Sequence, residues 1–193
     1  MKLTLIRHGL TEGNLKRWYY GGVDIPLAPE GEAALRTLRE QYDYPTGRRY
    51  YTSGMIRTEQ TFAILYGDQP HTVVPGLREM HFGDWEQCSY EDLKDDPAFI
   101  AWATGDVEHH AAPNGESFAQ VYDRVGEAIL PILEKNEDAV CVVHGGVIAF
   151  LLKRWFPTDL AHTYERTPEP GHGYQVTFTD GVPVEYIHVP FAR

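Results

Sequence analysis

Residues 139–146 have the sequence AVCVVHGG, in which five apolar residues are followed by a histidine and two glycines. A continuous apolar run of this length, rich in valine, is typical of a strand buried on both faces of a parallel sheet. His144 stands directly after the predicted strand. Because ligands of open α/β sheets bind at the carboxyl ends of the strands, we expect the His144 side chain at a ligand site.

A second strand of this kind opens the chain. Residues 2–6 are apolar and β-prone, and Arg7, His8 and Gly9 follow them. We expect the two strands to deliver both imidazoles to the same edge of the sheet. The Arg7 guanidinium beside one imidazole indicates a site for an anion, because guanidinium presents a fixed fork of donors to phosphate oxygens.

The rest of the chain alternates strand and helix patterns, which predicts an α/β fold. We expect further strands at 49–53 and 71–74, and a closing hairpin made of residues 174–179 and 184–188. Apolar spacing predicts helices at 29–42, from the cap Ser53 to about residue 66, at 90–93, at 97–104, from Asn114 through residue 133, and at 146–156.

Length and spacing bound the domain organisation. The chain has 193 residues, enough for one domain with a substantial core, and contains no internal repeat or domain linker. We expect a single domain over residues 1–193. Residues 75–113 are predicted to form a helical and loop insertion that covers the active site.

Charge and cysteine content exclude several classes of protein. The formal net charge of −11 argues against binding to nucleic acid or to an anionic membrane surface. Cys88 and Cys141 have no metal-ligand spacing and make no disulfide framework. The sequence contains neither a secretory signal pattern nor an apolar run long enough to cross a bilayer, so we expect a cytoplasmic protein.

Three further residues near the predicted strand ends add donors to the anion site. Thr11 and Asn14 follow the first strand and supply neutral polar groups within one loop. Arg57 lies in the first turn of the helix after strand 49–53. The amino-terminal end of a helix presents free N–H groups and a positive dipole end, which favours an anion there.

Glu79 is the candidate acid. It follows strand 71–74, which would place it at the same sheet edge if that strand is parallel to the others. Asp84 and Glu86 are competing candidates, and Glu79 has an alternative role as the ion-pair partner of an arginine. With Glu79 as the acid, the residues indicate phosphoryl transfer through histidine. One imidazole attacks phosphorus, the arginines and the other imidazole hold the equatorial oxygens, and Glu79 protonates the leaving oxygen.

At residues 7–14 the chain reads RHGLTEGN, which resembles the R-H-G-x-T-x-x-N signature of the histidine phosphatase superfamily, also called phosphoglycerate mutase-like. Further matches follow in the family's order at Gly21, 24–27, Gly31, 53–61, 78–79, Gly83, Trp85, Glu86, 114–117 and 143–146. The resemblance implies a three-layer α/β sandwich with a mainly parallel central sheet flanked by helices.

The resemblance also implies roles for individual residues. His8 is expected as the phosphorylated nucleophile and Glu79 as the proton donor, with no metal and no cofactor. The expected phosphate pocket consists of Arg7, Asn14, Arg57 and His144. We also expect substrate contacts from Thr11, Tyr20, Gly21 and Gly145; Tyr20 replaces a polar residue, often Gln, that faces the substrate in the family.

We therefore expect a phosphomonoesterase of the histidine acid phosphatase type that hydrolyses a small phosphorylated metabolite. Within the family the chain most resembles the branch of α-ribazole phosphatase and the broad-specificity phosphatases. One alternative is a cofactor-dependent phosphoglycerate mutase, although residues 80–85 lack the basic cluster that would hold a second phosphate. The other is a non-catalytic phosphate-binding module. Trp18, Tyr19 and Tyr20 either stack on the leaving group or, as we expect, pack against the 75–113 insertion.

Overall fold

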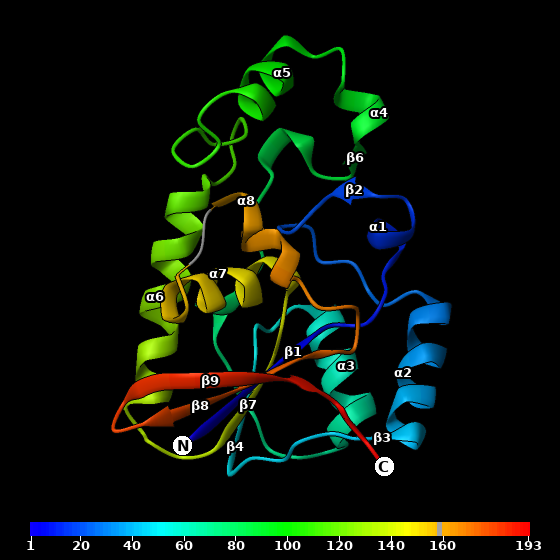
Figure 1. The fold of residues 1–193 in the computed structure, drawn as a ribbon. Helices are drawn as coiled ribbons and strands as arrows, with labels where there is room; N and C mark the ends of the chain where they lie inside the picture. Colours follow the sequence, from blue (N-terminus) through cyan, green and yellow to red (C-terminus); the bar gives the residue numbers. More distant parts are fainter. Residues whose placement is uncertain (158–159) are drawn as a thin grey trace.

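The computed structural model describes residues 1–157 and 160–193 of the chain. Within these ranges the central sheet has six strands in the order β5-β4-β7-β1-β8-β9 (Figure 1). The strands are β1 (Lys2–Arg7), β4 (Arg49–Thr52), β5 (Thr72–Val73), β7 (Ala139–Val143), β8 (Gly173–Thr179) and β9 (Val182–Val189).

The sheet is mixed but mostly parallel. β5, β4, β7 and β1 run parallel to one another, whereas β8 pairs antiparallel with β1 and β9 antiparallel with β8. The apolar run 139–143 forms β7 between β4 and β1, and all of its residues are buried. The predicted hairpin forms β8 and β9 and supplies the antiparallel side of the sheet.

Helices flank both faces of the sheet, which confirms the predicted α/β class. α2 and α3 lie on one side and α6 and α7 on the other (Figure 1). The helices are α1 (Glu12–Leu15), α2 (Pro29–Gln41), α3 (Ile56–Tyr66), α4 (Tyr90–Leu93), α5 (Pro97–Thr104), α6 (Phe118–Leu133), α7 (Gly145–Trp155) and α8 (Leu160–Thr163). No described helix is long and apolar enough to cross a membrane.

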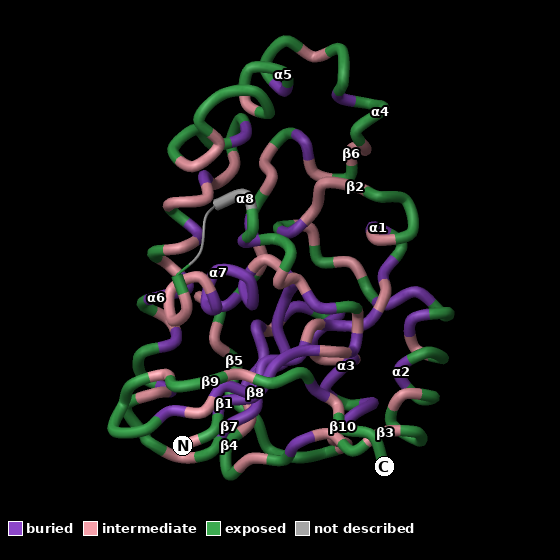
Figure 2. Tube along the Cα trace, in the orientation of Figure 1, coloured by how far each residue is buried: buried purple, intermediate pink, exposed green. Residues whose placement is uncertain are grey.

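Alternate residues of the central strands divide the core into two clusters. Cys141 and Val143 of β7 belong to the cluster that contains Ile148 of α7, because successive side chains of a strand point to opposite faces. Val142 belongs to the cluster that contains Phe62 of α3. The buried residues therefore concentrate around the sheet (Figure 2).

Two predicted helix starts are wrong. Ser53 does not cap α3, whose N-cap is Met55; the Ser53 hydroxyl instead contacts the ring of His144. Asn114 does not open α6, which begins at Phe118 after the N-cap Ser117. Residues 114–117 form a turn, with φ of 59° at Asn114. A serine whose hydroxyl accepts from the third helical N–H is a strongly preferred start, and Ser117 and Gln120 form such a capping box.

A separate group of short elements lies beyond the carboxyl edge of the sheet (Figure 1). It includes β6 (Cys88–Ser89), which pairs with β2 (Trp18–Tyr19), and the helices α4 and α5. Its small apolar core contains Trp85, Leu93, Phe99 and Ala112, against which Tyr19 packs. The remaining short elements are η1 (Pro75–Leu77), η2 (Gly83–Trp85), η3 (Tyr164–Arg166), β3 (Tyr42–Asp43) and β10 (Phe191–Ala192).

Candidate active site

Strand register places His8 beside His144. β1 and β7 are parallel, and Arg7 pairs with Val143. Each histidine is the residue that directly follows one of these two adjacent strands. The backbone N–H of His8 donates to the Val143 carbonyl at 3.0 Å. The ring centroids lie 5.2 Å apart, and both side chains are buried. The carboxyl edge of the sheet therefore carries two adjacent imidazoles.

The His8 ring is arranged as a neutral imidazole, and one of its nitrogens has no hydrogen-bond partner in the part of the chain that the structure describes. Its Nδ1 lies 2.7 Å from the Gly9 carbonyl oxygen, which only accepts hydrogen bonds, so the proton of the neutral ring belongs on Nδ1. Burial, and then the charges of Arg57 and Arg7, lower the pKa of His8 well below its ordinary value. Nε2 consequently keeps a lone pair near neutral pH, as a nucleophile requires.

His144 is held by hydrogen bonds at both ring nitrogens. Arg57 Nε donates to Nδ1 at 3.3 Å, so the ring proton lies on Nε2 and is donated to Ser53 Oγ at 2.8 Å. Burial, followed by the Arg57 charge, lowers the pKa of His144 well below its ordinary value. Ser53 follows β4, the neighbour of β7, and that strand-end position is the sequence signal that identifies it as a site residue.

Arg57 is completely buried and its direction is fixed by backbone carbonyls. Its two terminal nitrogens donate to the carbonyl oxygens of Val23 and Gly21, each at 3.0 Å. The guanidinium carbon lies 5.3 Å from the centre of the Tyr20 ring. The loop at residues 21–23 therefore belongs to the support of this arginine.

Glu86 and Asp84, the other candidates for the proton donor, instead hold loops in place. The Glu86 carboxylate accepts backbone N–H bonds from residues 21–23 and from Phe82, at distances between 2.8 and 3.1 Å. The Asp84 carboxylate accepts the Asn114 amide, with both oxygens 3.0 Å from its nitrogen. Glu86 therefore fixes the loop that in turn fixes Arg57.

Glu79 lies at the amino-terminal end of α7, next to His144. Its Oε2 accepts the backbone N–H of Gly146 at 2.9 Å, and its Oε1 accepts that of Met80 at 3.0 Å. A Cβ atom at position 146 would lie 2.5 Å from Glu79 Oε1, so glycine is required for this approach. Within residues 1–157 and 160–193 Glu79 forms no ion pair with an arginine.

Arg7 turns one nitrogen toward the segment that precedes β8. Its terminal nitrogen donates to the Pro168 carbonyl at 2.8 Å. Its Nε is buried and has no hydrogen-bond partner among the described residues. A Cβ atom at Gly145 would lie 3.2 Å from this Nε, which places Arg7 against the start of α7. A buried donor without a partner costs about 1–3 kcal/mol, so its position indicates a place for a ligand oxygen.

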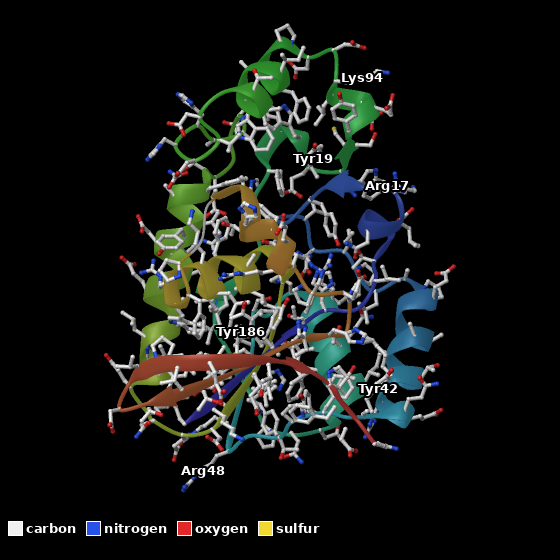
Figure 3. The ribbon with its side chains drawn as sticks, in the orientation of Figure 1. Arg17, Tyr19, Tyr42, Arg48, Lys94 and Tyr186 are labelled. Atoms are coloured by element: carbon white, nitrogen blue, oxygen red, sulfur yellow. The ribbon has the colours of Figure 1, made fainter. Side chains whose placement is uncertain are left out.

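Thr11, Asn14 and Tyr20 form one hydrogen-bonded group next to Arg57. The Thr11 hydroxyl donates to Asn14 Oδ1 at 3.1 Å and lies 2.6 Å from the Tyr20 hydroxyl, whose proton it accepts. Burial raises the pKa of Tyr20, which keeps this phenol protonated. The three aromatic residues at 18–20 lie in different places. Trp18 pairs with Ser89 of β6 and Tyr19 packs among the outer elements (Figure 3), whereas Tyr20 faces Arg57.

The structure thus brings together residues from the ends of β1, β4 and β7, from the starts of α3 and α7, from the loop after β1 and from the segment after η1. They are Arg7, His8, Thr11, Asn14, Tyr20, Gly21, Ser53, Arg57, Glu79, His144 and Gly145. In the part of the chain that the structure describes, no three His, Cys, Asp or Glu side chains gather as a group that could hold a metal ion.

The chain is similar to known proteins in sequence and in fold. The sequence model of the histidine phosphatase superfamily (branch 1) matches residues 3–186. Adenosylcobalamin/alpha-ribazole phosphatase of Salmonella typhimurium is 31% identical over 188 residues, which cover 94% of this chain and 92% of that protein. The chain therefore belongs to the histidine phosphatase superfamily, branch 1.

The chain is also similar to a phosphatase of solved structure and to a mutase. The crystal structure of the alpha-ribazole phosphatase from Shigella flexneri superposes with a TM-score of 0.83 and 27% identity over 95% of this chain and 93% of that chain. A 2,3-bisphosphoglycerate-dependent phosphoglycerate mutase of Cytophaga hutchinsonii is 27% identical over 206 residues, which cover 97% of this chain and 94% of that protein. Phosphatases and a mutase are thus both similar to this chain.

Proposed function

We propose that this protein is a metal-independent phosphomonoesterase that hydrolyses a small phosphorylated metabolite through a phosphohistidine at His8. One observation carries the proposal. His8 is buried beside His144, close enough to Arg7 and Arg57 for their charges to lower its pKa, and its Nε2 has no hydrogen-bond partner among the described residues. A neutral nucleophile next to fixed cations suits attack on a phosphate ester.

In the proposed reaction His8 Nε2 attacks phosphorus in line, and the bond between phosphorus and the leaving oxygen breaks. Glu79 donates its proton to that oxygen, and the product alcohol leaves. Glu79 then removes a proton from water, which attacks the phosphohistidine and breaks the bond between phosphorus and nitrogen. Inorganic phosphate leaves and His8 is restored. General acid and base assistance contributes about 10²–10⁴ in rate.

The phosphoryl oxygens are assigned to four residues, namely Arg7, Asn14, Arg57 and His144. Support comes from the unpartnered Nε of Arg7 and from the fixed direction of Arg57. Each preorganised donor of this kind contributes about 10²–10³ in rate, because it faces charge that develops in the transition state. Tyr20, Thr11, Gly21 and Gly145 are assigned to the wall of the pocket.

We also propose that residues 1–193 form one domain in which the 75–113 segment covers the site. Support comes from the pairing of β2 with β6 and from the Glu86 bonds to residues 21–23, since both join this segment to the loop after β1. The outer elements would then form part of the wall against the leaving group, which is where substrates are discriminated.

The substrate is best sought among phosphate esters of alcohols, with α-ribazole phosphate first because similar phosphatases carry that name. The test is a panel of phosphorylated metabolites ranked by kcat/KM, without added metal. We expect release of inorganic phosphate. Interconversion of 3- and 2-phosphoglycerate with added bisphosphate, at a higher rate than any hydrolysis, would show a mutase instead. Tight phosphate binding with no turnover of any ester would show a binding module.

A further inference from the structure

The segment that carries Glu79 has no regular structure of its own. Residues 78–82 belong to neither helix nor strand. Local backbone bonds therefore do not fix the position of the Glu79 main chain, and other parts of the molecule must supply its partners. Two residues that the proposed reaction does not use, Arg124 and Glu116, supply them.

Arg124 donates hydrogen bonds to three main-chain carbonyl groups, the last of which is that of Glu79. It projects from α6, and one terminal nitrogen donates to the carbonyl oxygens of Gly76 at 2.9 Å and Arg78 at 3.0 Å. The other donates to the Glu79 carbonyl oxygen at 3.4 Å. One guanidinium thus fixes the chain on the amino-terminal side of the acid.

Glu116 holds the same segment from its other side. Its carboxylate forms a two-point pair with Arg124, at 2.8 Å to Nε and 2.8 Å to a terminal nitrogen. The carboxylate also accepts the His81 N–H at 2.9 Å, and the Glu116 N–H donates to the His81 carbonyl at 2.8 Å. A Cβ atom at Gly115 would lie 2.6 Å from that carbonyl oxygen, so the close approach of residues 114–117 to His81 depends on a glycine at position 115.

We propose that Arg124 and Glu116 are positioning residues for the Glu79 carboxyl group. The pair grips the main chain at 76–79 and at 81, and so fixes the point from which the Glu79 side chain reaches the leaving oxygen. A displacement of about 1 Å at a reacting group can cost about 10²-fold in rate. This inference rests on the proposed function, because it takes Glu79 as the proton donor.

A merely structural role for the pair predicts a different kinetic result. Loss of stability, or a general distortion of the site, reduces turnover of every ester by a similar factor. Loss of a positioned acid acts selectively, since a good leaving group departs without a proton and a poor one does not. Because kcat/KM covers the steps up to the first irreversible one, its dependence on the leaving group reports the acid step separately from hydrolysis of the phosphohistidine.

The experiment compares p-nitrophenyl phosphate with phenyl phosphate, whose leaving group is poorer but of nearly the same shape. For Arg124→Met and Glu116→Gln we expect kcat/KM on phenyl phosphate to fall about ten- to hundredfold. On p-nitrophenyl phosphate it should stay within about threefold of wild type. Glu79→Gln should show the same selective loss, and Arg124→Lys should recover part of it.

Arg154→Met is the matched control. Arg154 is exposed to a similar degree, 33% against 28% for Arg124. Like Arg124 it donates to a main-chain carbonyl, in this case that of Tyr122 in α6, at 2.9 Å. Its loss should leave the ratio of the two kcat/KM values unchanged. Thermal melts check that each variant folds, and the isosteric Glu116→Gln carries the test if Arg124→Met does not fold.

Two results overturn the inference. An equal loss on both esters in the Arg124 and Glu116 variants, alongside a selective loss in Glu79→Gln, would give the pair a structural role only. No selective loss in Glu79→Gln would remove Glu79 as the acid, and the positioning role with it. Failure of the proposed function looks different, because wild-type protein would then hydrolyse neither ester.

Discussion

Ser53 Oγ lies 2.8 Å from His144 Nε2, although the two residues are 91 positions apart in the chain. Arg57 fixes the tautomer of the ring, because its N–H can only donate to Nδ1, so Nε2 carries the proton that Ser53 accepts. The hydroxyl of Ser53 also lies 3.1 Å from that of Thr58, so the histidine is the first member of a buried hydrogen-bond chain. Such chains orient a ring more firmly than a single bond.

Replacement of Ser53 by alanine should lower kcat/KM about tenfold, since it leaves a buried ring N–H without its acceptor. Ser53→Thr, which keeps the hydroxyl, should lose less. Ser89→Ala, which removes the half-buried N-cap of α4, serves as the control and should leave kcat/KM unchanged. Steady-state kinetics on p-nitrophenyl phosphate measure the three effects. Wild-type kinetics in Ser53→Ala would show that His144 needs no orienting partner.

Binding of a phosphate mimic should be accompanied by proton uptake. Neutral His144 has no N–H left for an oxyanion, because it accepts from Arg57 and donates to Ser53. While the bond to Ser53 stays in place, the ring can donate to a phosphoryl oxygen only after Nδ1 releases Arg57 and takes a proton. Calorimetric titration with sulfate, in two buffers of different ionisation enthalpy, measures the protons taken up.

Uptake of up to one proton is expected in wild-type protein near neutral pH, and much less in His144→Asn. Sulfate is a suitable probe because it stays a dianion throughout this range. Identical heats in the two buffers would mean that His144 remains neutral and that the arginines alone bind the anion.

Glu86→Gln should weaken phosphate binding, because one carboxylate accepts all the N–H bonds that hold residues 21–23 beneath Arg57. The glutamine side chain carries an NH₂ group, which would face backbone N–H groups that are themselves donors. We expect the KM for any ester and the Ki of inorganic phosphate to rise about tenfold together. Asp84→Asn, at the neighbouring loop contact, is the control and should leave both near wild type.

Acid should destabilise the folded protein through its two site histidines. Their rings have ordinary pKa values of about 6.5 in the unfolded chain, whereas burial and the arginine charges lower both in the folded protein. Below pH 6.5 the unfolded chain therefore binds more protons, and the free energy of unfolding decreases as the pH falls toward the lowered pKa values. Above that pH this contribution to stability is complete.

Thermal melts between pH 7.5 and 5.5 test this linkage, with His8→Asn/His144→Asn as the comparison. The Tm of the wild-type protein should fall more over that range than the Tm of the double variant. Equal slopes would show that neither ring is kept neutral by folding.

Local patterns in the sequence were sufficient to predict the sheet and the placement of both histidines. The apolar run 139–143 and the strand before Arg7 are each followed by a histidine and a glycine, and parallel pairing of two such strands leaves one geometry for His8 and His144. The hairpin of β8 and β9 was equally readable from its turn. These features depend on burial and local chain geometry, and both are reflected in the order of apolar, polar and turn-forming residues along the chain.

The supports of the site could not be read in the same way. Arg124 meets Glu79 across 45 residues, and Glu86 meets Gly21 across 65. Such bonds leave no periodic trace in the sequence, and a charged residue in a loop or on a helix resembles any solvated one. The predictions that Ser53 caps α3 and that Asn114 opens α6 are wrong for a related reason, since serine and asparagine are preferred at helix starts and tertiary partners outweigh the local preference.

Quenching the enzyme with alkali and SDS during turnover of a ³²P-labelled ester tests most directly whether His8 is the nucleophile. The label should appear in the amino-terminal peptide that contains His8, stable to base and released by acid, and it should be lost in His8→Ala while phosphate binding persists. His172→Ala, at a histidine that leads into β8, should trap label like wild type. Turnover by His8→Ala at the wild-type rate, or label on any other residue, would exclude His8 as the nucleophile.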